Sequence, residues 1–185
     1  METAVRSSVA LVALCAALLP LAACSVDVQQ SEDVGGKTVD VRTPVGDVTV
    51  RTDKDAPDIG LPIYPGSRPS QSRHDEPENA DVNITSSMFG LQVRAAKYDS
   101  DDAQDKVVEY YRKEMRAFGD VTECRGEVDF KGAHGAKHPV CKEKPFSRDI
   151  HLVTGTEEHQ RIVVVKPRSD GSEIALVQLE MRGKG

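Results

Sequence analysis

The first clear pattern of apolar and polar positions lies between residues 38 and 57. Valines alternate with polar residues on both sides of a Pro-Val-Gly-Asp turn sequence, at Val39, Val41, Val48 and Val50. A period of two is typical of a strand with two unlike faces, and the turn residues favour a reversal between two such strands. The pattern predicts a short β-hairpin followed by a charged connector. Because an isolated hairpin is only marginally stable in water, we expect it to pack on the domain that follows.

Two further runs with the same period come after a proline-rich, charged stretch. Residues 82–85 and 89–95 alternate between apolar and polar side chains, which predicts two neighbouring strands. The apolar positions of the second run are expected to face the core, and they are Phe89, Leu91, Val93 and Ala95. The segment from Leu61 to Gly66 leads into this domain, and its two prolines exclude a helix there.

Residues 101–118 have the pattern of an amphipathic α-helix. Apolar residues recur every three or four positions and form one stripe, made of Ala103, Val107, Tyr111, Met115 and Phe118. Asp99 or Ser100 is placed to cap the first free amides, and Gly119 is placed to end the helix. A single apolar stripe of this kind is typical of a helix that packs on a sheet.

The last third of the chain predicts three more strands. They cover residues 150–154, 161–166 and 173–181. The pair Asp170–Gly171 favours a tight turn between the last two. Residues 121–124 fit a short strand, whereas residues 125–144, rich in glycine and lysine, are expected to form a loop.

These elements predict an α+β fold, in which an antiparallel β-sheet meander carries one amphipathic helix on a face and is preceded by the hairpin. The chain then divides into a signal peptide at residues 1–23, a flexible linker at 24–37, the hairpin and connector at 38–57, and an α+β domain at 58–182. The linker is assigned because its residues are polar and acidic and cannot build a core.

The N-terminal residues have the pattern of an export signal. Arg6 precedes an apolar run over residues 9–19 that is too short to span about 30 Å of hydrocarbon, and Pro20 ends it. The Leu-Ala-Ala-Cys sequence at residues 21–24 resembles the lipobox of bacterial lipoproteins. The resemblance implies cleavage after Ala23, a diacylglycerol on the thiol of Cys24, and acylation of the new amino terminus.

This resemblance implies a location for the protein. It would be lipid-anchored in the cell envelope and face the periplasm, with the membrane as its first partner. In enterobacterial lipoproteins a serine after the lipidated cysteine favours the outer membrane, and Ser25 occupies that position. The alternative is a soluble secreted protein in which Cys24 is a bystander, although Leu21 fits the ordinary signal peptidase poorly.

The remaining cysteines outside the signal form one pair. Two thiols exported to an oxidising compartment most simply form a disulfide, here between Cys124 and Cys141. The alternative is a periplasmic metal site in which these two thiolates join His134 and His138 around a zinc or copper ion. The glycines around the two histidines and the lack of a Cys-x-x-Cys pair count against that site.

Composition limits the classes of function. The net charge of −6 argues against nucleic acid as a partner, and 4% aromatic residues with no tryptophan leave little for stacking on bases or sugars. No local motif of a hydrolase, nucleotide-binding protein or metalloprotease is present, although catalytic groups can converge in space. We therefore expect no cofactor and no enzymatic activity, but a binding or structural role with an envelope protein as a further partner.

A second resemblance covers most of the mature chain. It rests on the lipobox, the Arg42–Gly46 segment of the hairpin, the Leu61–Gly66 segment, the Tyr110–Met115 helix sequence and the Gly155–Gln160 turn. Taken together they resemble a group of uncharacterised bacterial envelope lipoproteins. The resemblance implies architecture and location, and it implies no activity.

Overall fold

The structure is a computed structural model that describes residues 26–33, 36–53, 56–70, 79–132 and 137–183. Its elements are, in order, β1 (Asp27–Asp33), β2 (Gly36–Thr43), β3 (Gly46–Asp53), β4 (Arg68–Pro69), β5 (Asn79–Ser86), β6 (Phe89–Ser100), α1 (Gln104–Met115), the 3₁₀ helix η1 (Arg116–Phe118), β7 (Val121–Cys124), β8 (Gly126–Lys131), β9 (His138–Glu143), β10 (Ile150–Gly155), β11 (His159–Arg168) and β12 (Gly171–Gly183). The fold is therefore mainly β, with one short α-helix.

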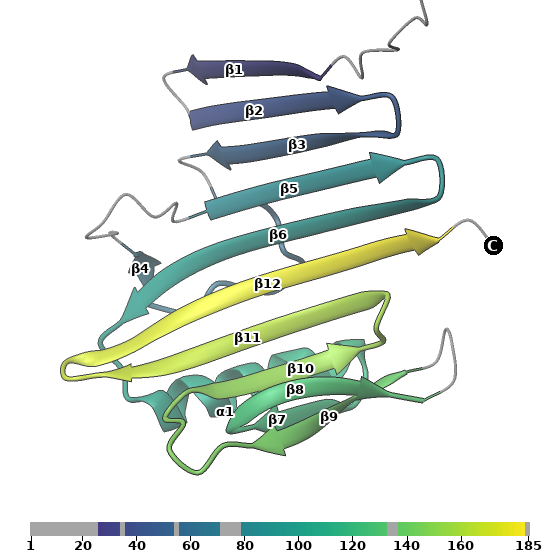
Figure 1. Cartoon of the computed structure of the whole chain (residues 1–185). Coiled ribbons are helices and arrows are strands. Elements are labelled where there is room, and N and C mark those ends of the chain that lie inside the picture. The colour runs from purple at the N-terminus through teal and green to yellow at the C-terminus, as the bar shows by residue number, and fades with distance from the viewer. Residues whose placement is uncertain (1–25, 34–35, 54–55, 71–78, 133–136, 184–185) are drawn as a thin grey trace, which may run out of the picture.

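Ten of the strands form one antiparallel sheet (Figure 1). Their order is β1-β2-β3-β5-β6-β12-β11-β10-β7, and β4 pairs with β6 outside this path. The strands predicted at residues 121–124, 150–154, 161–166 and 173–181 are confirmed as β7, β10, β11 and β12. The strands β2 and β3 pair with each other as expected, but they do not precede the sheet as a separate unit, because β3 also pairs with β5.

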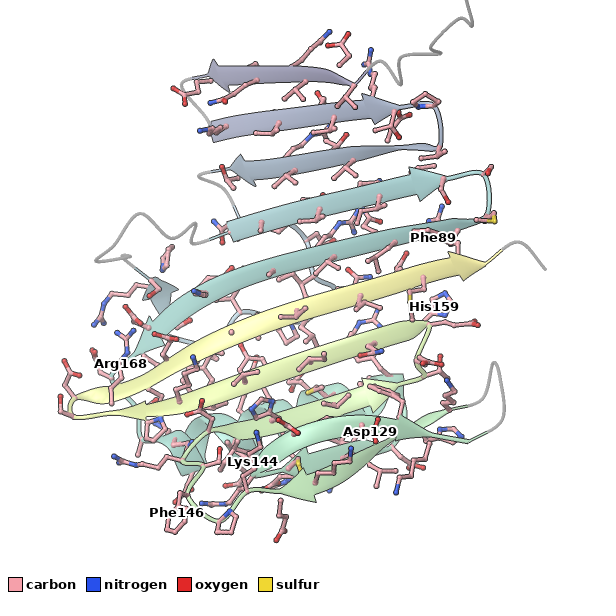
Figure 2. The ribbon with its side chains drawn as sticks, in the orientation of Figure 1. Phe89, Asp129, Lys144, Phe146, His159 and Arg168 are labelled. Atoms are coloured by element: carbon pink, nitrogen blue, oxygen red, sulfur yellow. A yellow bond between two sulfur atoms is a disulfide. The ribbon has the colours of Figure 1, made fainter. Side chains whose placement is uncertain are left out.

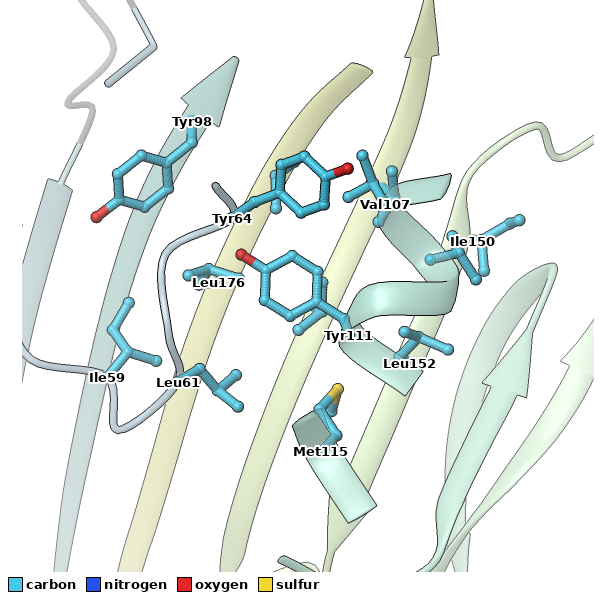
Figure 3. Packing of buried hydrophobic residues seen from close by; sticks show 14 of the residues in the cluster. Ile59, Leu61, Tyr64, Tyr98, Val107, Tyr111, Met115, Ile150, Leu152 and Leu176 are labelled. Carbon is cyan, nitrogen blue, oxygen red and sulfur yellow. The ribbon is translucent and has the colours of Figure 1, made fainter. Parts of the chain in front are cut away.

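The hydrophobic core lies between α1 and one face of the sheet (Figure 3). The helix contributes Val107, Val108, Tyr111 and Met115, all buried. The sheet contributes buried side chains from four adjacent strands, namely Ala96, Tyr98, Ile150, Leu152, Val163, Val165, Ile174 and Leu176. The cross-strand register places these residues on one side of the sheet, so the helix covers that side.

An extended segment closes the core beside the helix. Residues 56–67 run along the edge of α1 and bury Ile59, Leu61 and Tyr64 in the core. The Tyr64 ring packs edge-on against Tyr110, with ring centroids 5.1 Å apart, and its hydroxyl donates a hydrogen bond to Asp102 at 2.8 Å. The segment is not helical, as its two prolines predict, but it bends at Gly60 and turns at Pro65–Gly66, where the Ser67 amide donates a hydrogen bond to the Tyr64 carbonyl oxygen at 3.0 Å.

The boundaries of the helix differ from those predicted. Ala103 lies just before α1 and is exposed, and α1 gives way to a 3₁₀ turn before Phe118. The Phe118 ring is 38% exposed and lies 3.9 Å beneath the guanidinium of Arg161. The apolar stripe is therefore shorter by one residue at each end, because the tighter turn rotates Phe118 away from the buried face.

The stretch expected to be a loop, residues 125–144, contains two strands instead. β8 and β9 pair in a separate two-stranded sheet, and Lys142 of β9 forms an ion pair with Asp129 of β8 at 2.9 Å. The two strands lie on the face of the main sheet opposite α1, because Cys124 points to that side and is bonded to Cys141 of β9. The glycines and lysines of this stretch masked a short alternation around Val128 and Phe130.

The flexible linker predicted at residues 24–37 also differs from the structure. Residues 27–33 form β1, which pairs along its whole length with β2. Its side chains are mostly exposed and, apart from Val28, polar, so the segment lacks the alternating apolar pattern of a strand. It is ordered by backbone hydrogen bonds at a sheet edge, and these do not depend on side-chain pattern.

Candidate binding surface

The sheet extends well beyond the part that the helix covers. Figure 1 shows β1, β2, β3 and β5 as a single layer, with α1, β8 and β9 confined to the opposite end of the sheet. Among the described elements, the substantial contacts of β2 and β3 are with neighbouring strands alone. Both faces of this part of the sheet are therefore open in the chain as described.

One of these faces carries continuous rows of aliphatic side chains. The cross-strand register aligns a first row of Val28, Val41, Val48, Ile84, Leu91 and Met181. A second row consists of Val39, Val50, Val82, Val93 and Leu179. A third row consists of Ala80, Ala95, Val177 and Ile162. We call these three rows the valine face.

The valine face is open and carries no charge within its rows. Val28 on the edge strand is 60% exposed, and the other residues of the rows are half-buried by their neighbours in the sheet. Phe89 lies on the same side of β6 as Leu91, next to the first row at the β5–β6 turn, and is 49% exposed (Figure 2). Contiguous exposed apolar surface of this kind marks a contact site on a protein.

The opposite side of the same strands is polar. Its central hollow, about 410 Å³, is lined by Asp47, Thr49, Arg51, Asp81, Asn83, Thr85, Gln92 and Arg94. Arg94 forms an ion pair with Asp81 at 3.5 Å, and the Thr49 hydroxyl donates a hydrogen bond to Asp40 at 2.6 Å. Antiparallel sheets with one buried and one solvated face show this division. The division into an aliphatic and a polar side is thus typical of a sheet whose aliphatic side is buried against another surface.

The side of β6 that faces the core was predicted wrongly. Leu91, Val93 and Ala95 belong to the valine face, whereas the core under α1 takes Ala96 and Tyr98, the opposite alternation. β6 is twelve residues long and crosses both halves of the sheet. Its apolar side therefore changes along its length, because the helix covers the other face at one end.

A cluster of tyrosines, formed by Tyr64 with Tyr110 and Tyr111 of α1, is the other site with unusual chemistry. Burial, together with the hydrogen bond to Asp102, raises the pKa of Tyr64 to about 12, and burial also raises the pKa of Tyr111. Hydrogen bonds from Lys106 and then from Tyr64 lower the pKa of Asp102. These shifts keep the phenols protonated and the carboxylate charged at neutral pH. Neither phenol is then suited to act as a general base.

The disulfide predicted from the sequence is present. Cys124 of β7 and Cys141 of β9 are bonded, with their Cα atoms 5.2 Å apart. The alternative metal site loses both thiolate ligands to this bond. His138 is exposed at the start of β9, and His134 lies outside the described residues. Within the described ranges, the structure groups no three histidine, cysteine, aspartate or glutamate side chains in a way that would hold a metal.

The predicted lipid anchor lies outside the described residues. Cys24 and the signal at residues 1–23 belong to the stretch that precedes them, so the anchor stays a prediction. Among the helices that are described, none combines the length and the apolar character needed to cross a membrane.

Sequence reasoning identified valines of the hairpin but missed the surface to which they belong. The sequence does not show that apolar residues of neighbouring strands lie side by side in rows. The alternation of apolar and polar residues in β5, β6 and β12 could have suggested such rows. Comparison with known proteins adds no relative to this picture: no protein-family model, no curated protein and no solved structure matches the chain.

Proposed function

We propose that this chain is a lipid-anchored protein of the bacterial cell envelope whose function is to bind another envelope component through the valine face. The observation that carries this proposal is the uncovered aliphatic face on a sheet whose other side is polar. A solvated protein gains nothing from such a face, and burying it against a partner is favourable in proportion to the apolar area removed from water.

A non-catalytic role agrees with the chemistry of the described side chains. The largest shifts in pKa belong to tyrosines buried in the core under α1, and they stabilise the protonated form. His151 has its pKa lowered chiefly by burial, and Cys124 beside it in the sheet is held in a disulfide. The described groups with altered pKa are therefore buried side chains of the core or members of ion pairs and hydrogen bonds such as Asp129 with Lys142, and no nucleophile lies beside a base among them.

The lipid anchor is proposed from the sequence, and the start of β1 limits how far the anchor would lie from the sheet. Cys24 precedes the first residue of β1, Asp27, by three residues, a reach of about 10 Å at most. An acylated Cys24 would therefore hold the edge of the sheet at the membrane surface, with Ser25 favouring the outer membrane. A mature protein held in this way by two or more acyl chains is stably anchored.

The anchor is tested by mass spectrometry of the protein extracted from its own envelope. The expected N-terminal peptide begins at Cys24 and carries the added mass of a diacylglycerol and an amide-linked acyl chain. The Cys24→Ala variant should remain unprocessed or leave the membrane fraction. A full-length, unacylated chain in the cytosol would contradict the proposal.

The binding role is tested by a matched pair of charge substitutions on β3. Val50→Asp places a carboxylate in the middle of the valine face, whereas Thr49→Asp places one on the polar side of the same strand. The amount of protein that co-purifies with its envelope partner after crosslinking should fall with the first change and not with the second. Equal recovery of the two variants, both folded, would contradict a role for this face.

A further inference from the structure

The valine face is one side of a single layer of strands, and the hollows described near it lie at the β5–β6 turn and on the polar side of the sheet. The hollow at the β5–β6 turn, about 340 Å³, is lined mainly by polar and turn residues. Small molecules bind in concave sites that surround most of their surface. The shape of the face therefore fits another flat surface.

From these features we infer that the occupant of the valine face is the valine face of a second copy of this chain, so that two sheets pack face to face as in a β-sandwich. This inference rests on the proposed binding role and names its partner. Sheets pack in this way about 10 Å apart through interdigitating β-branched and aliphatic side chains. Valine dominates the two longer rows, and the rows contain no charge that a second copy would have to neutralise.

The area of the face is that of a small interface. Three rows about 7 Å apart, with six, five and four residues on strands about 4.8 Å apart, cover roughly 500 Å² of each copy. Two copies would thus remove roughly 1,000 Å² from water, which is the lower limit for a specific interface. Two copies tethered to one membrane also meet at a raised effective concentration, which favours a dimer of this size.

Pairing of the sheets edge to edge is disfavoured by charge. The edge of the sheet beside the valine face is β1, whose sequence Asp-Val-Gln-Gln-Ser-Glu-Asp carries three acids and no base, and the other end of the strand order is β7. An antiparallel pair of two β1 strands centred on Gln30 would set Asp27 of each copy opposite Asp33 of the other. Like charges placed directly opposite destabilise a strand pair, and acidic edge strands are a common protection against such pairing.

A bilayer is also a poor occupant of this face. Proteins that lie on membranes surround their apolar surface with lysine, arginine and tryptophan. This chain contains no tryptophan and has a net charge of −6, and the charged residues next to the valine face on β1 and β2 are the ion pair of Glu32 with Lys37. Among the described strands, the basic residues in register next to the rows are Lys37, paired with Glu32, and Lys97 of β6, and two such residues fit a protein surface better than an anionic leaflet.

The test uses single cysteines on the two sides of one strand. Val82→Cys places a thiol near the centre of the valine face, and Asn83→Cys places one on the polar side of β5. The full-length chain is expressed in its own envelope, treated with a short bifunctional maleimide, and separated by mass. A second pair on β6, Val93→Cys and Gln92→Cys, decides the result if Val82→Cys fails to fold, as judged by resistance to trypsin.

The expected result is an adduct of twice the chain mass, containing this chain alone and joined at residue 82 or 93. It should be at least fivefold more abundant than the adduct from Asn83→Cys or Gln92→Cys. A folded Val82→Cys or Val93→Cys protein that stays monomeric, that crosslinks to a different protein, or that crosslinks no better than its control overturns the inference.

Failure of the lipid anchor would be distinguishable from failure of the dimer. The wild-type chain, treated in the same way, should not react at Cys24 if that sulfur carries a diacylglycerol. A maleimide found on Cys24 would contradict the anchor, while the adduct at residue 82 or 93 would still report on the face, because peptide mapping separates the two positions.

Discussion

Breaking the bond between Cys124 and Cys141 should cost the fold about 3 kcal/mol. The bond closes a loop between residues 17 positions apart, and the loss of chain entropy in the unfolded state gives this magnitude for a loop of that length. For a chain of this size the loss corresponds to a fall in melting temperature of about 6–12 °C. The bond also joins the β8–β9 pair to β7, and an isolated two-stranded sheet is marginally stable in water.

The assay is urea unfolding of the purified protein with and without reductant, followed by circular dichroism. The double variant Cys124→Ala/Cys141→Ala should match the reduced protein and should not respond to reductant. Hydrogen exchange should accelerate in β8 and β9 more than in α1, because the helix retains its packing on the sheet. A loss below about 1 kcal/mol, or exchange that accelerates equally in α1, would refute the reasoning.

Three further predictions concern single side chains. Thr154→Val should raise the free energy of unfolding by about 1 kcal/mol in urea titrations, because the buried Thr154 hydroxyl has no hydrogen-bond partner in the structure, and an unchanged or lower stability would contradict this. Burial lowers the pKa of His151, so protonation of this side chain below pH 6.5 should destabilise the fold. The free energy of unfolding should therefore decrease between pH 7.5 and 5.5, and it should decrease less in His151→Gln. Because the pKa of Tyr64 is raised to about 12, its protonated phenol stabilises the fold fully below pH 10, and this stabilisation is lost as the pH rises through 12. Tyr64→Phe should therefore lose less free energy of unfolding over this range than the wild type. An equal loss in the two proteins would contradict the role of this phenol.

The sequence predicted strands more reliably than it predicted what covers them. The alternation over residues 89–95 correctly indicates a strand, since a period of two reports that the two faces differ. It does not report which face meets the helix, and so Leu91 and Val93 were assigned to the core that Ala96 and Tyr98 occupy. Only the register with β12 and β5 reveals that the apolar side of β6 changes along its length.

Strands without an apolar pattern were missed for a different reason. β1 is polar except for Val28 and is ordered by backbone pairing with β2, through hydrogen bonds that every residue except proline can donate. β8 and β9 are held by cross-strand ion pairs and by the disulfide, which hydrophobic periodicity does not record. The disulfide itself was predictable, because the sequence predicts export, and two cysteines outside the signal then most simply bond to each other.

The most direct test of this account asks whether the valine face is covered in the native envelope. Single-cysteine variants at Val82 and Asn83, neighbours on opposite sides of β5, are exposed to a maleimide that carries a long polyethylene glycol chain, too bulky to enter between two packed sheets, in isolated membranes and again after unfolding in urea. The account predicts that residue 82 is protected in the native state and residue 83 is labelled, with both labelled after unfolding. Equal labelling of the two positions in the native envelope would show that the face is open to water, and it would contradict the central claim.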